Sequence, residues 1–491
     1  MGHGVKILHG ISIQAVITFL IGVSEMIVFA VMSRFLNKTD FGYYAALSAI
    51  IIVFSSLSEA GIGSAIIQKQ TISDKYISTA FTLSFGLGLF FTLLLYCFSF
   101  PLGLLIADEN LVLPLKIVAI TLLFNSVNSV ARGILSRKLN FKVIGVIQLL
   151  AYCISSIVGI IMAIYGYGLY AIIVATILNS FLVTILSYSR YVKIPTFCIL
   201  RTDVKDISYF GGWLTLSVIV NNISLQLDKL VLSKLVSISE LGAYNRPSGF
   251  VSGIVGRINN IFDTVLFPIL SKLQEHLSEL QKVFIKSLFF LNLCSNLLAA
   301  FFFFNAELII LVFFGHEWLD LVPVLRIYSI TVVFMIDGRL VDCFFRSLGL
   351  VRLAFYLRIF ACICTFCALF IGVTWSLKGI AWAVVIVNFV IISIKMAFLI
   401  KHLAVSMCVV VNEIISSWKP QLVNLLIGCP YLCYSGERSL LLHVTYCLLF
   451  LFTNVIMFLF LPRFVGKQYE RVVYPLIKNK LLSYNSIFTK R

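Results

Sequence analysis

Charged residues are scarce in this chain. Asp, Glu, Lys and Arg make up 12% of its 491 residues, and only 21 residues are acidic. The connections between its apolar stretches are short, and residues 190–206 form one of the longest hydrophilic segments. None of these connections could hold a soluble catalytic domain, so the sequence argues against a soluble enzyme.

Several chemical signatures are also missing. The glycine-rich segments at 86–88 and 165–168 lack the Lys-Ser/Thr pair that follows a phosphate-binding loop, so we expect no ATP hydrolysis. The six histidines are scattered, and only His443 lies inside an apolar run, where we expect a packed polar residue. Neither pattern resembles a catalytic site, and no catalytic residue is predicted.

The twelve cysteines lie mostly in apolar runs, where Cys behaves as a small hydrophobic residue. Cys362, Cys364 and Cys367 form the densest group, but residues two apart on a helix point to different faces. The sequence therefore predicts no metal site, no cofactor and no disulfide.

What the chain has in abundance is apolar sequence. Hydrophobic residues make up 60% of it, and the mean hydropathy is +1.03. Apolar segments of about 20 residues, enough to cross a hydrocarbon core of roughly 30 Å, recur along almost its whole length. The first apolar run, residues 7–32, is too long for a signal-peptide core and lacks an A-x-A-like end. These features predict an all-α polytopic membrane protein.

We expect about fourteen transmembrane helices. Their approximate ranges are 7–32, 41–66, 77–100, 111–130, 143–165, 169–188, 207–232, 241–269, 283–304, 321–345, 353–375, 380–400, 418–434 and 440–461. The thirteenth range is the least secure because Gly428 and Pro430 interrupt it.

Basic residues alternate between the loops. Loops after even-numbered spans are basic, whereas those after odd-numbered spans are poor in charge or acidic, with Arg34, Lys38 and Lys234 as exceptions. Because cytoplasmic loops are enriched in Lys and Arg, both termini are expected in the cytoplasm. The same preference accounts for the net charge of +17 through contact with anionic membrane lipids, so no nucleic-acid partner is predicted.

The chain also contains an internal repeat. Residues 33–44 (SRFLNKTDFGYY) match residues 233–244 (SKLVSISELGAY), including Gly42 with Gly242 and Asp40 with Glu240. Further matches follow in the same order, 115–117 with 325–327 and 168–169 with 379–380. Because six helices return the chain to its starting side, the halves are expected to be parallel bundles around a central cavity.

This repeat sets the expected domain boundaries. They are an N-terminal six-helix bundle at 1–188, a cytoplasmic linker at 189–206, a C-terminal six-helix bundle at 207–400, two further transmembrane helices at 401–462 and a basic cytoplasmic tail at 463–491.

Charged and amide side chains inside the spans mark the candidate site. A charge at a helix centre costs about 2.5–3.5 kcal/mol on insertion scales and is expected to face a bundle interior or water. Many of these residues lie three or four apart on one helix face. The candidates for contacts with substrate are Asn125, Asn128, Arg132, Asn221, Ser224, Arg246, Arg257 and Arg339, and those for ion coupling are Glu25, Glu59, Asp228, Asp263 and Asp342.

A purely structural interpretation stays open for part of this set. Arg339, Asp342 and Arg346 are three and four apart and could neutralise one another. Asn and Ser side chains often join helices, at roughly 0.6 kcal/mol each. For Glu25 and Glu59, which have no basic residue within one helical turn, the functional interpretation is favoured.

Several short motifs carry a resemblance to a known family. They are Asp40-Phe-Gly42, Glu59-Ala-Gly-Ile-Gly63 with Ile67-Gln-Lys69, Arg132 with Leu139-Asn-Phe-Lys142, Leu227-Asp-Lys-Leu230, Leu241-Gly-Ala-Tyr-Asn-Arg246 and Leu266-Phe-Pro-Ile-Leu-Ser-Lys-Leu273. Over roughly residues 1–400 the chain resembles the polysaccharide-transport branch of Wzx-type oligosaccharide flippases, closest to colanic-acid-type exporters. That branch belongs to the multidrug/oligosaccharidyl-lipid/polysaccharide superfamily.

The resemblance implies two six-helix lobes around a central cavity. It also implies that the chain flips polyprenyl-diphosphate-linked oligosaccharides across the bacterial inner membrane by alternating access. H+ or Na+ would be the coupling ion, and a polysaccharide polymerase and a chain-length regulator in the same membrane are implied partners. Arginine side chains would grip the diphosphate through paired hydrogen bonds, and Ser and Asn would bond sugar hydroxyls.

Three rival functions remain. A cation-coupled multidrug exporter of the same superfamily would use a more apolar cavity and usually twelve spans. A membrane enzyme of polysaccharide assembly would be expected to carry a large periplasmic loop or a catalytic His/Asp pair. A scaffold protein would not need acidic groups in mid-membrane.

Overall fold

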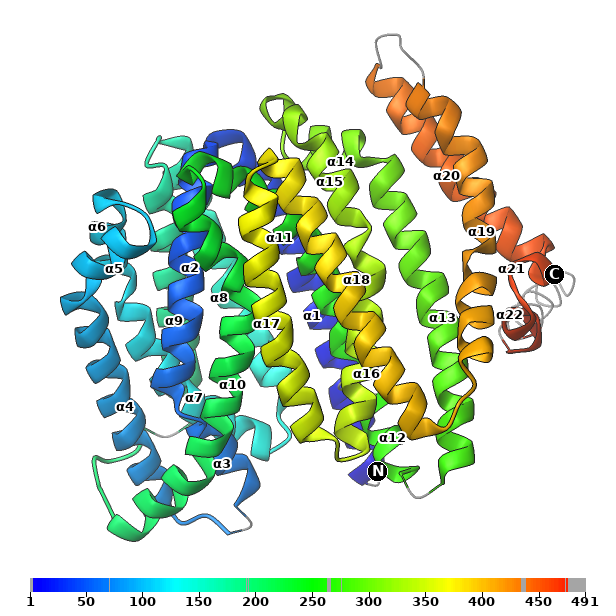
Figure 1. Cartoon of the computed structure of the whole chain (residues 1–491). Coiled ribbons are helices and arrows are strands. Elements are labelled where there is room, and N and C mark those ends of the chain that lie inside the picture. Colours follow the sequence, from blue (N-terminus) through cyan, green and yellow to red (C-terminus); the bar gives the residue numbers. More distant parts are fainter. Residues whose placement is uncertain are drawn as a thin grey trace, which may run out of the picture. The chain divides into compact units, whose positions relative to one another are not determined.

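The computed structural model describes residues 3–69, 71–190, 192, 194–262, 266–274, 276–433, 439–472 and 474–475. All regular secondary structure in this described part is helical (Figure 1). Eleven stretches of it are long and apolar enough to cross a membrane, which confirms the predicted class of all-helical membrane protein.

The chain forms two compact units that divide between Asn245 and Arg246. The first unit covers Met1–Asn245 with Phe313–Gly315. Its elements are α1 (His3–Phe35), α2 (Lys38–Glu59), α3 (Ile62–Gln68), α4 (Asp74–Cys97), α5 (Ser99–Ile106), η1 (Glu109–Leu111), α6 (Val112–Val118), α7 (Ile120–Arg137), α8 (Phe141–Ile164), α9 (Leu169–Arg190), α10 (Arg201–Leu235) and the beginning of α11 (Ile238–Ile261).

The second unit covers Arg246–Val312 and His316–Arg491. After the remainder of α11 it contains α12 (Phe267–Lys272), α13 (Leu277–Phe304), α14 (Ala306–Phe313), η3 (His316–Leu321), α15 (Val322–Ser329), α16 (Thr331–Ser347), α17 (Val351–Val373), α18 (Ser376–Leu403), α19 (Met407–Cys433), α20 (Leu440–Phe460), α21 (Pro462–Val465) and α22 (Lys467–Val472). The predicted lobes, 1–188 and 207–400, place α10 in the second lobe, whereas here it packs with the helices of the first unit. The predicted domain boundaries describe lobes in the membrane, and they stay a prediction.

Eleven of the fourteen predicted spans coincide with membrane-length apolar helices of the described part. The other three fall on α10, α11 and α19, which are helical but more polar. In α10, for example, Asn221, Asn222 and Gln226 interrupt the apolar sequence. The count of fourteen spans therefore stays a prediction.

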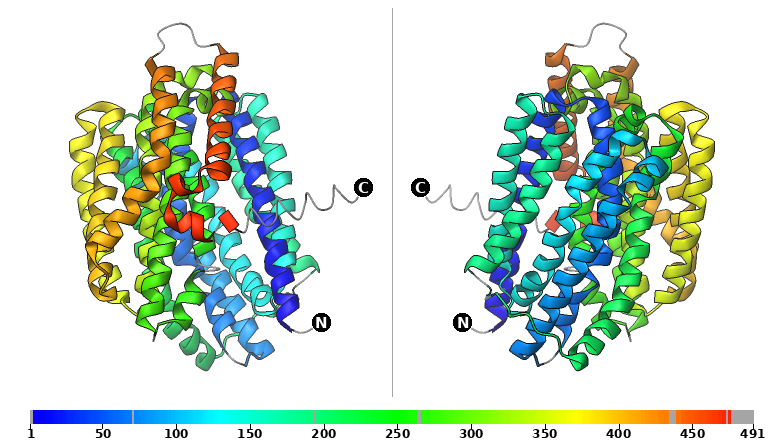
Figure 2. Two further views of the ribbon diagram at one scale, coloured as in Figure 1. Left: turned by 90° about the vertical axis from the view of Figure 1, so that its right-hand side faces the viewer. Right: turned by 90° about the vertical axis from the view of Figure 1, so that its left-hand side faces the viewer.

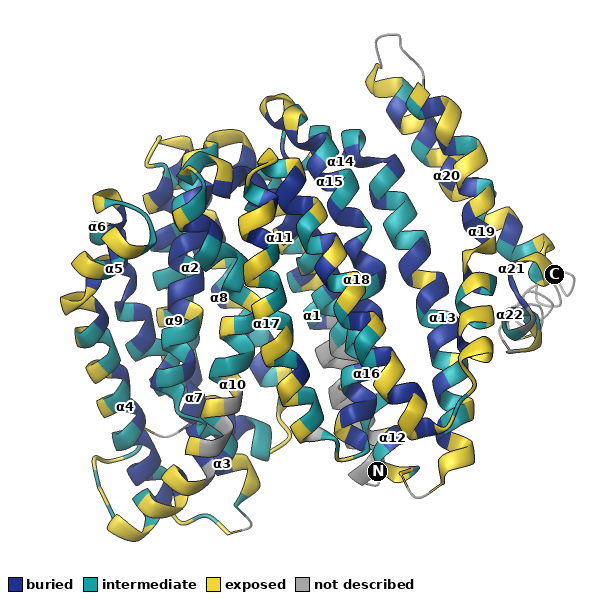
Figure 3. Ribbon diagram, viewed as in Figure 1, coloured by how far each residue is buried: buried dark blue, intermediate teal, exposed yellow. Residues whose placement is uncertain are grey.

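Exposed residues recur along the helices (Figure 3), and many of them are large and apolar. In α17, only 11% of the residues in the most apolar 18-residue stretch of Arg352–Val373 are buried. Phe19 of α1 is 70% exposed. Apolar surface on this scale would be a liability in water and is the normal outer face of a helix in lipid.

In the first unit, helix packing brings α1 and α7 to α9 together. α1 lies alongside α8, as both views of Figure 2 show, and α9 packs against α7 and α8. A buried apolar cluster that includes Ile66, Phe81, Val130 and Leu135 joins α3, α4 and α7. α1, α7, α8 and α9 surround the cavities described below.

In the second unit, α19 and α20 pack onto α13 through aromatic side chains. Phe304, Tyr431, Tyr446 and Phe450 form one buried cluster, and the Tyr431 and Tyr446 rings stack 4.0 Å apart. Although Gly428 and Pro430 were expected to interrupt this span, α19 continues as a helix to Cys433.

The repeated motif folds in the same way in both copies. Asn37 accepts a hydrogen bond from the backbone N–H of Asp40 at 2.9 Å, and the Asp40 carboxylate accepts one from the Asn37 backbone at 3.2 Å. Ser237 and Glu240 form the same reciprocal capping box, at 3.2 and 3.0 Å. Each box satisfies two N–H groups that the first turn of a helix leaves free, so each copy begins a helix, α2 or α11.

The two copies of the motif also touch each other inside the first unit. At Gly242, an added Cβ would lie 2.8 Å from the backbone N of Gly42 and within 3 Å of the Lys38 carbonyl group. At Gly42, an added Cβ would overlap the Ile238 carbonyl group in the same manner. The crossing of α2 and α11 therefore requires glycine on both sides.

Candidate functional site

A cavity of about 350 Å³ lies inside the first unit, among α1, α7, α8 and α9. Two predicted residues, Glu25 and Asn125, lie in its wall. The lining residues are Ile21, Glu25, Asn125, Gln148, Tyr152, Asn179, Ser180 and Val183. One carboxylate, three amides and two hydroxyl groups thus converge within a bundle whose outer surface is apolar, and we call this space the amide cavity.

Burial in the wall of the amide cavity is uneven. Glu25 of α1 is an exposed residue. The Asn125 amide donates a hydrogen bond to the Ser55 hydroxyl of α2 at 3.2 Å. The Asn179 carbonyl oxygen is buried and accepts no hydrogen bond from a described residue, which leaves an acceptor beside the cavity.

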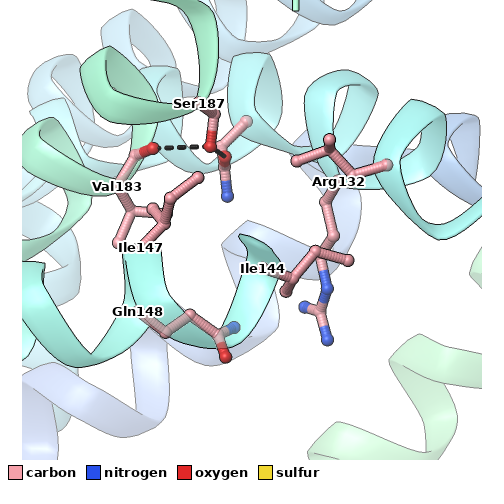
Figure 4. A pocket seen from close by; sticks show the side chains of 8 residues that line it. Arg132, Ile144, Ile147, Gln148, Val183 and Ser187 are labelled. Atoms are coloured by element: carbon pink, nitrogen blue, oxygen red, sulfur yellow. Dashed lines mark hydrogen bonds between the residues drawn. The ribbon is translucent and has the colours of Figure 1, made fainter. Parts of the chain in front are cut away.

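A smaller cavity of about 10 Å³ adjoins the amide cavity and shares Gln148 and Val183 with it. Its volume suits about one water molecule. Figure 4 shows the Arg132 side chain passing Ile144 of α8, with its guanidinium group on the same side as the Gln148 amide. The Ser187 hydroxyl of α9 donates to the Asn128 carbonyl oxygen at 3.2 Å, so Asn128 also joins two helices.

Glu59 comes close to Arg132 because of a glycine-rich turn. α2 ends at Glu59, and Ala60 and Gly61 adopt left-handed φ angles of 45° and 63° that redirect the chain into α3. An added Cβ on Gly63 would lie 2.7 Å from the Ser129 carbonyl oxygen, so α3 approaches the backbone of α7 directly. Arg132 of α7 is thereby close enough to act electrostatically on the Glu59 carboxylate.

The predicted residues of α10 also lie in the first unit, but they line neither cavity. Asn221 and Ser224 are half-buried. The neighbouring Asn222 donates to the Ser56 hydroxyl of α2 at 2.6 Å. Asp228 accepts a hydrogen bond from the Tyr244 hydroxyl at 3.0 Å, which ties α10 to the second copy of the repeated motif.

In the second unit, Asp342 has basic partners on two other helices. Lys395 of α18 lies 2.8 Å from its carboxylate, and Arg358 of α17 lies 3.8 Å away. This geometry favours a structural role for Asp342, through partners far from it in sequence. Arg346 donates a hydrogen bond to the Asp342 carbonyl oxygen at 3.4 Å.

The remaining predicted residues belong to the second unit. Arg246 is buried, and Arg257 and Arg339 are half-buried. Asp263 lies outside the described residues. The structure therefore brings Glu25 to Asn125, and Arg132 to Asn128 and Glu59.

Sequence reasoning missed several polar residues of the interior. Gln148, Tyr152, Asn179 and Ser180 were overlooked because α8 and α9 carry no charged residue in mid-helix and no long polar stripe. A carboxylate in the second unit, Asp337, was missed as well, although it is only 6% exposed. The signal for it was present: an acidic residue two positions before Arg339 in a predicted span.

Metal ligation finds no support in the described part of the chain. It contains no group of three or more His, Cys, Asp or Glu side chains that could hold a metal ion. Cys362, Cys364 and Cys367 form no disulfide bond within the described part of the chain.

Comparisons with known proteins agree with this membrane architecture. Residues 31–323 match the family model described as "Polysaccharide biosynthesis protein". The teichuronic acid biosynthesis protein TuaB of Bacillus subtilis is 25% identical over 411 residues, which cover 81% of this chain and 83% of TuaB. The lipopolysaccharide biosynthesis protein WzxC of Escherichia coli is 24% identical, with 72% and 73% of the two chains covered.

Among solved structures, the inward closed conformation of the lipid II flippase MurJ is similar in fold. Its TM-score is 0.69 at 15% identity, and the match covers 91% of this chain and 98% of the MurJ chain. The matched family model spans more than half of the chain. The chain therefore belongs to the polysaccharide biosynthesis protein family of Wzx-like flippases and is a membrane transporter rather than an enzyme.

Proposed function

We propose that this chain flips polyprenyl-diphosphate-linked oligosaccharide repeat units across the bacterial inner membrane by alternating access. The repeat units would belong to an O-antigen, a capsule or an exopolysaccharide. The proposal includes fourteen spans, both termini in the cytoplasm and coupling to H+ or Na+. It is supported by family membership and by the names of the relatives, which refer to teichuronic acid and lipopolysaccharide biosynthesis.

The amide cavity is the observation that carries the proposal. Sugars present many hydroxyl groups, and each hydroxyl needs a hydrogen-bond partner once it leaves water. Asn125, Gln148 and Asn179 supply both donors and acceptors, and the Asn179 carbonyl oxygen lacks a partner among described residues. About 350 Å³ is at the lower end of small-molecule sites, so the cavity suits part of an oligosaccharide headgroup.

Arg132 is the basic residue that we assign to the diphosphate. Its exposed guanidinium group lies next to the amide cavity through the shared Gln148 and Val183. Guanidinium binds phosphate through two parallel hydrogen bonds. Arg246, Arg257 and Arg339 remain proposed contacts, with Asn128, Asn221 and Ser224 as proposed partners of sugar hydroxyls.

Among the residues predicted from the sequence, the ion-coupling role is best supported for Glu25 and Glu59, which adjoin the amide cavity and Arg132. A carboxylate in this position could bind a cation while the headgroup is absent. Asp228 and Asp263 stay proposals, and Asp342 is the weakest of the set because Lys395 and Arg358 already compensate its charge.

A cation-coupled multidrug exporter is the alternative within the superfamily. Such a protein would use a more apolar cavity, whereas the amide cavity has a single aromatic residue, Tyr152, in its wall. A polysaccharide polymerase and a chain-length regulator in the same membrane are proposed partners of the flippase.

A flipping assay in proteoliposomes tests the proposal. Purified protein is reconstituted with a fluorescent polyprenyl-diphosphate oligosaccharide, and the fraction reaching the inner leaflet is measured. Arg132→Ala should reduce the flipping rate at least tenfold, since a charge-assisted hydrogen bond is worth about 1.5–3 kcal/mol, and Arg132→Lys should keep part of it. The matched control is Lys138→Ala, which removes an exposed basic residue at the same end of α7.

The outcomes separate the two functions. Flipping of the sugar lipid by wild type, lost in Arg132→Ala and kept in Lys138→Ala, supports the proposal. Export of lipophilic cations without any flipping of sugar lipids would favour the multidrug exporter and contradict it.

A further inference from the structure

The second unit contains a buried acid next to a buried amide. Asp337 of α16 is 6% exposed, and Asn292 of α13 is 1% exposed. The Asn292 amide nitrogen donates one hydrogen bond to the Asp337 carboxyl group at 2.8 Å and another to the Leu288 carbonyl oxygen at 3.1 Å. Neither residue contributes to the amide cavity, and neither belongs to the site proposed above.

The charge of an ionised Asp337 would be uncompensated. Among the described residues its hydrogen-bond partner is Asn292, and none of them forms an ion pair with it. α16 packs against α12, α13, α15, α17 and α18. The titratable or charged groups of these helices and of α16 are Lys272 (α12); Glu279, Lys282, Lys286 and Cys294 (α13); Arg326 and Tyr328 (α15); Arg339, Asp342, Cys343 and Arg346 (α16); Arg352, Tyr356, Arg358, Cys362, Cys364 and Cys367 (α17); and Lys378, Lys395, Lys401 and His402 (α18).

None of these groups stabilises an Asp337 carboxylate. Lys395 and Arg358, which could have done so, are engaged with Asp342. A buried carboxylate without a cation is strongly unfavourable in a membrane-spanning bundle. The charge can be removed by a proton, which needs no additional space.

The Asn292 amide shows a complementary deficit. Its carbonyl oxygen is buried and accepts no hydrogen bond from the described residues, although the nitrogen of the same amide is bound to Asp337. A protonated carboxyl group has an O–H donor as well as an acceptor. One proton on Asp337 would therefore complete a two-bond acid–amide pair and satisfy both buried groups.

From this geometry we infer that Asp337 and Asn292 form a proton-binding site of the second unit, and that the proton it binds and releases is the coupling ion of the transporter. The step is the addition of H+ to a carboxylate oxygen to give the carboxylic acid, and no other group changes. The coupling role rests on the proposed function, whereas the presence of the proton does not. Asp337 lies two residues from Arg339 on α16, so its charge changes the field at a proposed substrate contact.

Infrared difference spectroscopy of the reconstituted protein, without substrate, tests for the proton. We expect a carbonyl band of a protonated carboxyl group near neutral pH that disappears on alkalinisation and is absent from Asp337→Asn, which keeps the shape of the acid. Asn292→Ala should move the band to higher frequency, because the acid carbonyl loses a hydrogen-bond donor. The control is Glu317→Gln, which replaces an exposed carboxylate of the same unit and should leave the band unchanged.

Flipping driven by a pH gradient tests the coupling. Asp337→Asn should abolish the dependence of the rate on the gradient, and Glu317→Gln should retain it. The inference would be overturned if the band were absent, or if it disappeared on adding Na+ at constant pH. It would also be overturned if the band never titrated while Asp337→Asn kept gradient-driven flipping. Because the band is recorded without substrate, a failure of the flipping assay alone contradicts the proposed function and leaves the proton site standing.

Discussion

Replacing Gly242 with Ala tests the crossing of α2 and α11 directly. In a helix interior this change normally gains about 1 kcal/mol, because glycine is a poor helix former. Here the new Cβ would lie within 3 Å of the Gly42 nitrogen and of the Lys38 carbonyl group. Both obstacles are backbone atoms, so the two helices would have to separate by on the order of 1 Å before normal contact distances of about 3.5 Å return.

Overpacking of this kind costs about 1–3 kcal/mol, and separation would also remove contacts along both helices. We therefore expect Gly242→Ala to be destabilising. The matched control is Gly249→Ala on the same helix, where an added Cβ meets no atom within 4 Å. This control should be neutral or slightly stabilising.

The measurement is the apparent unfolding temperature of detergent-purified protein at a fixed heating rate, since membrane proteins often unfold irreversibly. Wild type, Gly242→Ala and Gly249→Ala should rank with Gly242→Ala lowest by several degrees. An unfolding temperature for Gly242→Ala equal to that of Gly249→Ala would refute the requirement for glycine at the crossing.

Two further predictions concern charged pairs. Asp342→Asn should destabilise the second unit by about 3 kcal/mol, because it leaves Lys395 and Arg358 without a carboxylate in a largely buried place; unfolding temperatures should show a larger loss than for Glu317→Gln, and partial recovery when Lys395→Met is added. The Lys69 ammonium group donates a hydrogen bond to the Asp206 carboxylate at 2.8 Å, and this bond raises the pKa of Lys69. Because this ion pair is exposed, it stabilises the fold by less than about 1 kcal/mol. This stabilisation is present below the ordinary lysine pKa of about 10.4 and is lost as the pH rises through the raised pKa of Lys69. Asp206→Asn should accordingly have the same small effect on stability at pH 6 and pH 8, and a clear change between these two values would contradict this assignment.

Much of the helical architecture could be predicted from local sequence. The apolar runs specify membrane-length helices, and the Asn37–Asp40 and Ser237–Glu240 pairs begin α2 and α11 through interactions three residues apart. The repeat in the sequence identified Gly42 and Gly242 as equivalent. That these two glycines contact each other depends on how distant helices cross, which no local pattern reveals.

The candidate site could be predicted only in part, for a related reason. Helical spacing grouped Asn125, Asn128 and Arg132 on one helix, and all three lie on α7. Glu25 was singled out by its charge. The partners that complete the amide cavity, Gln148 and Asn179, are single amides on other helices, so their contribution appears only when α8 and α9 are packed together. For Asp342, helical spacing could not reveal the partner Lys395, which is 53 residues away in the sequence.

Because Gly42 and Gly242 contact each other, the two halves of this chain cannot change independently at these positions. Duplicated segments ordinarily drift apart independently, and most positions of SRFLNKTDFGYY and SKLVSISELGAY have done so. At these two glycines, however, the size that either residue can have is set by the backbone of the other copy. A larger side chain in one half would therefore collide with the backbone of the other half, which accounts for the same residue, glycine, at both positions.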